Sequence, residues 1–189
     1  MSDKRLRETF ADAPTNWGKW GDDDEIGAVN YLTEPQVLEG ARAIERGKTF
    51  ALGVPIGRRE GDPKTPSRPE AQHYMLRDRG HYEAGKLPAD GRQGSDDVLS
   101  LALHGTTHVD ALGHSWYGEE MYNGCDPETT KGGLERCSVE PIAEHGVVGR
   151  GVLLDVARHR DVTHLPYDAT ISLSELQACA DEQGVELRE

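Results

Sequence analysis

The sequence predicts an α/β fold in which helices flank a mixed sheet. Two segments carry helix-start signals, at Thr33 and Ser172, and three apolar runs have the length and composition of strands. The elements follow one another as helix, strand, long loop, strand, loop, strand and helix. This order favours helices packed on a sheet, although it leaves the topology open. The 189 residues suit a single domain spanning residues 1–189.

Both predicted helices begin with a capping box. Thr33 precedes the first helix, with Pro35 in its first turn and Gln36 three residues on. Gly47 ends an apolar pattern of helical spacing that is made by Val37, Leu38, Ala41 and Ile44. Ser172 with Glu175 starts the second helix, which we expect over residues 173–183, with Gly184 as its stop.

Three strands are expected at residues 49–56, 98–103 and 147–156, because each run is short and rich in apolar residues. Residues 57–97 are charged and contain several prolines and glycines. A structureless loop of that length is unusual inside a compact domain. We interpret it as an active-site cover, a hairpin excursion or a partly disordered insert. His73 and His81 lie in it and are interpreted as surface histidines, and residues 118–133 are loop-like.

The composition excludes several classes of partner. The formal net charge is −13, so the basic surface that binds nucleic acid or anionic membranes is missing. We interpret the acidic run at residues 22–25 as a solvated turn rather than a cation site. No N-terminal signal segment and no stretch of roughly 20 apolar residues is present. Three cysteines without a CxxC pair indicate reduced thiols and a cytoplasmic location.

The chemistry concentrates in residues 101–114, LALHGTTHVDALGH. His104, His108, Asp110 and His114 are all even-numbered, so in an extended segment their side chains share one face. On a helix the same residues would split onto two separated faces. Imidazole and carboxylate ligands without thiolates suit zinc, manganese or iron(II). The pattern therefore predicts a strand that ends in a loop bearing metal ligands.

This motif resembles the His-x-x-x-His-x-Asp-x-x-x-His signature of the cyclase-like metal-dependent hydrolases, which include bacterial kynurenine formamidases and isatin hydrolases. Two positions depart from the usual form: the glycine, Gly105, stands one place early, and Leu112 replaces the commonest proline. Neither is a ligand position. The segments NWGKWGDDDEIGAVNYLT and GVLLDVARH are similar to the same family, so the likeness covers nearly the whole chain.

The resemblance implies a swivelling β/β/α architecture and a role for each motif residue. His104, His108 and Asp110 would bind a divalent zinc or manganese ion, with Asp110 also facing a second metal where one is present. His114 would donate and accept protons. The family's further histidine and glutamate have no evident counterpart before Glu189. We therefore expect a C-terminally truncated chain, in which a one-metal site is favoured over a binuclear one.

The activity implied is hydrolysis of a small amide C–N bond, as in the arylformamidase step of tryptophan catabolism that converts N-formylkynurenine to kynurenine and formate. Two alternatives stay open: a lactam or lactone hydrolase of the isatin hydrolase type, and a catalytically incomplete fragment that binds metal or associates with itself. The family also implies a homodimer. Three tryptophans are candidates for binding an aromatic substrate: Trp17, Trp20 and Trp116.

Overall fold

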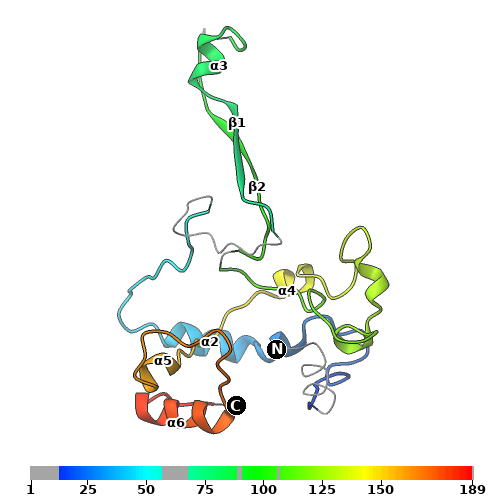
Figure 1. Cartoon of the computed structure of the whole chain (residues 1–189), viewed down its shortest axis with the longest axis vertical. Coiled ribbons are helices and arrows are strands. Elements are labelled where there is room, and N and C mark those ends of the chain that lie inside the picture. Colours follow the sequence, from blue (N-terminus) through cyan, green and yellow to red (C-terminus); the bar gives the residue numbers. More distant parts are fainter. Residues whose placement is uncertain (1–12, 57–67, 89–90, 106, 189) are drawn as a thin grey trace. The chain divides into compact units, whose positions relative to one another are not determined.

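The computed structural model describes residues 13–56, 68–88, 91–105 and 107–188 (Figure 1). Contacts divide the chain into two compact units, one made of Met1–Gly47 with Ala111–Glu189 and the other of Lys48–Asp110. This division does not test the expectation of a single domain, which stays a prediction. Helices lie in both units and the sheet lies in the second, so the predicted combination of helices and a sheet is confirmed.

The elements of the described residues are short. The helices are η1 (Gly27–Tyr31), α2 (Glu34–Arg42), α3 (Arg79–Glu83), η2 (Tyr122–Gly124), η3 (Pro127–Thr130), α4 (Glu140–His145), α5 (Val156–His159) and α6 (Leu173–Gln183). The strands are β1 (Gln72–Arg77) and β2 (Asp96–Ser100). No helix of the described residues has the length and apolar character needed to cross a bilayer.

Helix α2 lies where the sequence predicts a helix, but both of its ends differ in detail. Thr33 is the N-cap residue, yet its hydroxyl donates to the side-chain oxygen of Gln36 instead of accepting a backbone N–H. The helix ends at Arg42, well before Gly47. The capping box and the stop signal were therefore wrong. Gly40 lets α2 approach the backbone of Gly149 closely, because an added Cβ would lie 2.6 Å from the Gly149 carbonyl carbon.

Helix α6 confirms its prediction from first residue to last. The Ser172 hydroxyl accepts the backbone N–H of Glu175 at 3.2 Å, and Gly184 adopts the left-handed conformation at φ 65°. The Glu175 carboxylate turns away from the cap and pairs with Arg160, next to the end of α5. Helix α5 packs on α6, and Val156, Cys179 and Ala180 are buried there.

The segment predicted as a long loop contains a hairpin. Strands β1 and β2 pair antiparallel, with Gln72 opposite Ser100 and Met75 opposite Asp97, and the register shifts between Met75 and Arg77. Helix α3 lies at the far end of this hairpin (Figure 1). Residues 57–67 and 89–90 of the same segment lie outside the described residues. Of the three interpretations, the hairpin excursion is confirmed for residues 72–100.

The two histidines of this segment are surface residues, as expected. His73 contacts Asp97 at 2.6 Å, and His81 contacts Asp78, the N-cap of α3, at 2.7 Å. Both pairs have partly exposed side chains. These histidines therefore take part in local ion pairs within the hairpin rather than in the metal motif.

The strand predictions were largely wrong. Residues 49–56 and 147–155 are not paired in a β-sheet, and Val156 begins α5. Strand β2 starts two residues before the predicted 98–103 segment, stops at Ser100 and is exposed. The sheet of the described residues is two-stranded and antiparallel, not mixed. An apolar run becomes a strand only when a neighbouring strand supplies its hydrogen bonds, and no strand of the described residues lies beside these two runs. Leu52 and Leu153 remain 71% and 82% exposed.

Candidate metal centre

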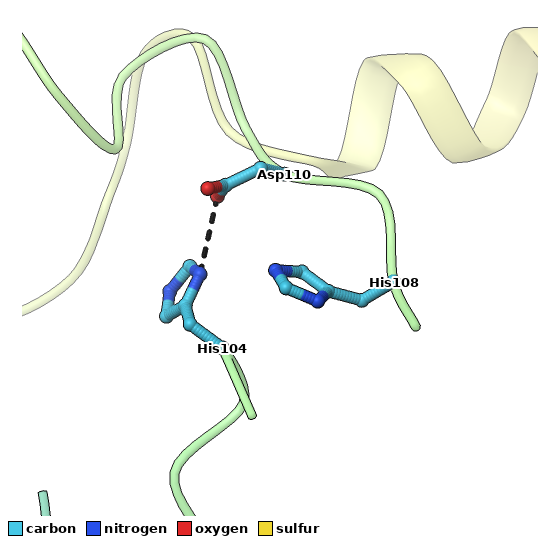
Figure 2. A group of neighbouring side chains, drawn as sticks. All are labelled: His104, His108 and Asp110. Carbon is cyan, nitrogen blue, oxygen red and sulfur yellow. Dashed lines mark ion pairs between the residues drawn. The ribbon is translucent and has the colours of Figure 1, made fainter. Parts of the chain in front are cut away.

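Three of the predicted ligands come together in the unit Lys48–Asp110. His104, His108 and Asp110 each offer one ligand atom, and these atoms all lie within 4.8 Å of one another. Figure 2 shows the three side chains pointing toward a common space. The imidazole rings of His104 and His108 are 5.2 Å apart at 78°, and His104 Nδ1 lies 3.4 Å from Asp110 Oδ1.

The described backbone that carries these residues is irregular and contains a turn at its start, and it is not a strand. Strand β2 ends at Ser100, and His104 with Gly105 forms a turn in which Gly105 is buried. The backbone carbonyl of His104 accepts a hydrogen bond from Arg68, and the Thr107 hydroxyl donates to the carbonyl of Leu52. The prediction of a strand leading into a ligand-bearing loop is therefore correct in order, although the strand ends earlier than expected.

The donor set fits a divalent metal ion. Zinc is bound at about 2.0–2.2 Å by imidazole nitrogen and carboxylate oxygen, so in tetrahedral coordination two donors of one ion lie about 3.4 Å apart. The ligand atoms of this group lie within 4.8 Å of one another, so binding an ion requires them to approach by up to about 1.4 Å. His108 and Asp110 are exposed, so their rotation closes that difference at low cost. Two imidazoles and one carboxylate also leave a coordination position for water or substrate.

The remaining predicted site residues lie in the other compact unit. His114 is exposed, and its backbone N–H donates to the carbonyl of Ala111 at 3.1 Å. Trp17 and Trp116 are 42% and 40% exposed. Trp20 makes an edge contact with Tyr31, with ring centroids 5.1 Å apart. The roles given to these four predicted residues stay predictions.

Sequence reasoning missed a polar network in the acidic segment. The Asp24 carboxylate accepts hydrogen bonds from the Tyr122 hydroxyl at 2.7 Å, the Asn30 amide at 2.6 Å and the Gly27 N–H at 2.9 Å. Burial acts to raise the pKa of Asp24, but the hydrogen bonds from Tyr122, Asn30 and the backbone outweigh it, and the pKa is lowered. Burial and the nearby Asp24 charge raise the pKa of Tyr122.

Asn123 and Glu25 extend this network. Asn123 Nδ2 donates to the carbonyls of Gly21, Asp22 and Asp24 at 3.0–3.2 Å, while its side-chain oxygen accepts the Gly18 N–H at 2.7 Å. Glu25 pairs with Arg136 at 2.8 Å and accepts the Cys137 N–H. The interpretation as a solvated turn therefore holds for the exposed Asp22 and Asp23 but is wrong for Asp24 and Glu25. These partners are about 100 residues apart, so no local pattern indicates them.

Comparison with known proteins decides the family. Residues 12–189 match the model of the Cyclase family, described as "Putative cyclase". The chain belongs to the cyclase family. A crystal structure described as that of a novel cyclase is 36% identical, with a TM-score of 0.80 over 93% of this chain. The chain spans 59% of the length of that cyclase. No curated protein matches it.

Proposed function

We propose that this cyclase-family chain carries the metal site of a hydrolase acting on a small amide C–N bond, of the arylformamidase type. The convergence of His104, His108 and Asp110 within 4.8 Å supports this proposal, because the group combines the ligands of a hydrolytic metal with an open coordination position. Membership of the cyclase family supports it independently. The substrate proposed is N-formylkynurenine, and the products are kynurenine and formate.

The proposed roles divide between binding and proton transfer. His104 and His108 hold the ion, zinc or manganese, through ring nitrogens, and Asp110 holds it through a carboxylate oxygen. When bound, such an ion lowers the pKa of water and polarises a carbonyl oxygen. His114 accepts a proton from the attacking water and returns it to the departing amine nitrogen. Imidazole suits this exchange because its ordinary pKa lies near neutrality.

The remaining proposals concern substrate binding and the fold of the family. Trp17, Trp20 and Trp116 would stack on the aromatic part of the substrate, since aromatic side chains offer large apolar faces. The swivelling β/β/α architecture, a homodimer and a cytoplasmic location are likewise proposed from the family. Because the chain spans 59% of the length of the solved cyclase, metal binding and turnover by this chain are proposed separately, and each has its own experiment.

The first experiment measures the metal content of the purified chain by elemental analysis after reconstitution with zinc or manganese. We expect about one equivalent bound by the wild type and its loss in His108→Ala. His73→Ala is the matched control, because His73 is a partly exposed histidine of the same unit that pairs with Asp97. Equal metal content in all three samples, or none in the wild type, would contradict the proposed site.

A second experiment separates the substrate classes. The metal-loaded chain is assayed with N-formylkynurenine, isatin and a simple lactone, with His114→Ala beside it. Hydrolysis of the formamide that falls by at least about 100-fold in His114→Ala, while metal content is unchanged, supports the proposed proton-transfer role. Preferential cleavage of isatin or the lactone would replace the formamidase assignment. Metal binding without turnover of any substrate would support the incomplete-fragment alternative.

A further inference from the structure

Two of the three cysteines meet inside the unit Met1–Gly47 with Ala111–Glu189. The Sγ atoms of Cys125 and Cys137 are 3.1 Å apart, and both thiols are free. Cys137 is fully buried, whereas Cys125 is partly exposed. A disulfide joins sulfurs at about 2.05 Å, so closing this pair requires a movement of about 1 Å. Rotation of the side chains supplies a movement of that size.

Backbone hydrogen bonds hold each cysteine in place. The carbonyl of Cys125 accepts the N–H of Met121 at 2.8 Å, which closes the turn around η2. The N–H of Cys137 donates to Glu25, and its carbonyl accepts the N–H of Gly113 at 2.9 Å. The Cys137 thiol also lies 3.6 Å from the carbonyl of Tyr122. The two sulfurs therefore lie close together because hydrogen bonds fix the backbone at both cysteines.

We propose that Cys125 and Cys137 form a thiol–disulfide site that is oxidised by low-molecular-weight disulfides. The Cys125 thiolate attacks one sulfur of the external disulfide, a mixed disulfide forms, and one external thiolate leaves. The Cys137 thiolate then attacks the Cys125 sulfur and expels the second external thiol. Two protons and two electrons pass from the cysteine pair to the external disulfide, which is reduced to two thiols.

Burial orders these steps. Only Cys125 is exposed to an external reagent, so it makes the mixed disulfide and Cys137 resolves it. Burial, followed by the nearby Cys125, raises the pKa of Cys137 to about 12. The resolving thiol is therefore protonated at neutral pH, and we expect the second step to accelerate as the pH rises. This proposal concerns a site distinct from the metal ligands and does not depend on the proposed hydrolase activity.

The cross-link would constrain the segment that follows the metal motif. It closes a loop from Cys125 to Cys137 that contains η3, and Cys137 holds Gly113 through its carbonyl. Gly113 is packed tightly there, since an added Cβ would lie 2.9 Å from Leu134 and 3.2 Å from the carbonyls of Arg136 and Cys137. We therefore expect oxidation to raise the melting temperature by roughly 5 °C.

The experiment uses the full chain, reduced and freed of metal, and equilibrated in glutathione buffers of increasing oxidised fraction. We expect the thiols counted after unfolding in denaturant to fall from three to one, with an intact-mass loss of about 2 Da. Trypsin cleaves after Lys131, so the oxidised sample should give one disulfide-linked pair of peptides that carry Cys125 and Cys137. Glutathionylated Cys125 that never resolves, or a chain that keeps three thiols, would overturn the proposal.

Matched variants distinguish the site from general thiol reactivity. Cys179→Ser should still lose about 2 Da, while Cys125→Ser should not. Cys179 is fully buried in α6, so in the samples that keep it, its protection from alkylation without denaturant reports that the chain is folded. Cys125→Ala is a second variant that lacks the Cys125 thiol, and it should likewise keep its mass. Cross-linking that involves Cys179, or that joins two chains, would overturn the assignment to this pair.

Discussion

The metal-ligand group and the Asp24 network are both polar clusters, but they are assembled differently. His104, His108 and Asp110 lie within seven consecutive residues of irregular backbone, and two of the three, His108 and Asp110, are exposed. The Asp24 network (Asp24, Glu25, Tyr122, Asn123 and Cys137) joins segments about 100 residues apart. Local spacing therefore predicts the first cluster, whereas only the tertiary contacts of the second reveal it.

The two clusters also differ in what holds them. The hydrogen bonds of the Asp24 carboxylate are complete within the protein, since three donors lie between 2.6 and 2.9 Å from it. In the ligand group each residue offers one atom that can bind a cation, and His108 and Asp110 are exposed while His104 is half-buried. We therefore expect the Asp24 network to stabilise the fold by itself, while the ligand group stabilises it further when a metal is bound.

The largest effect is expected from Asp24→Ala. This substitution removes the acceptor of three hydrogen bonds and leaves the partly buried Tyr122 hydroxyl without it, so we expect a loss of about 2–3 kcal/mol in the free energy of unfolding. Asp22→Ala, an exposed neighbour, should change it by less than about 0.5 kcal/mol. Urea unfolding measures both. Equal losses would show that the acidic run acts only as a solvated turn.

Substitutions of Asn123 should change the free energy of unfolding by less than Asp24→Ala, and they test the backbone geometry of the same network. Its φ is 58°, a conformation that glycine adopts easily and alanine does not. Asn123→Gly removes the hydrogen bonds without adding backbone strain and should cost about 1 kcal/mol, whereas Asn123→Ala adds backbone strain and should cost about 2 kcal/mol. The pair is compared by urea unfolding. An alanine variant as stable as the glycine variant would argue against strain at this position.

For the ligand group, His104→Ala should change the stability of the metal-free chain by less than about 1 kcal/mol, because its side chain is partly exposed. The same variant should lose the rise in melting temperature that zinc produces in the wild type. Thermal unfolding with and without zinc provides the measurement, and His73→Ala should keep the zinc response. A large loss in the metal-free variant would mean that the group is structural.

The smallest effect is the dependence of stability on acid pH. Hydrogen bonds lower the pKa of Asp24 against the effect of burial, and the hydrogen bond from Arg160 lowers that of Glu175. A lowered folded pKa adds stability that is fully present above the unfolded values, 3.8 and 4.5, and is lost as the pH falls through the folded ones. Urea unfolding from pH 7 to 3 should show this decline. Asp24→Asn should decline less steeply, and an identical slope would contradict the role of Asp24.

Prediction from the sequence succeeded for elements whose ends depend on adjacent residues, and it failed for strands, which form only when another segment pairs with them. Ser172 and Gly184 delimit α6 correctly because capping and the left-handed stop depend on adjacent residues. The runs at residues 49–56 and 147–155 show the opposite case, since their apolar character predicts strands but no strand in the described part of the chain pairs with them. The hairpin was only one of three interpretations because exposed strands lack the alternating pattern that burial imposes.

The sequence by itself determined the family motif, the proximity of His104, His108 and Asp110 and the last helix, since spacing of a few residues is enough to place side chains that lie on one short segment or one helix. Tertiary structure alone decided that Asp24 is a hydrogen-bonded anchor and that Cys125 meets Cys137. Contacts between distant segments depend on how the chain folds back on itself. The entropic cost of closing such long loops depends on their length and not on a residue pattern, so the sequence shows no periodicity that would indicate these contacts.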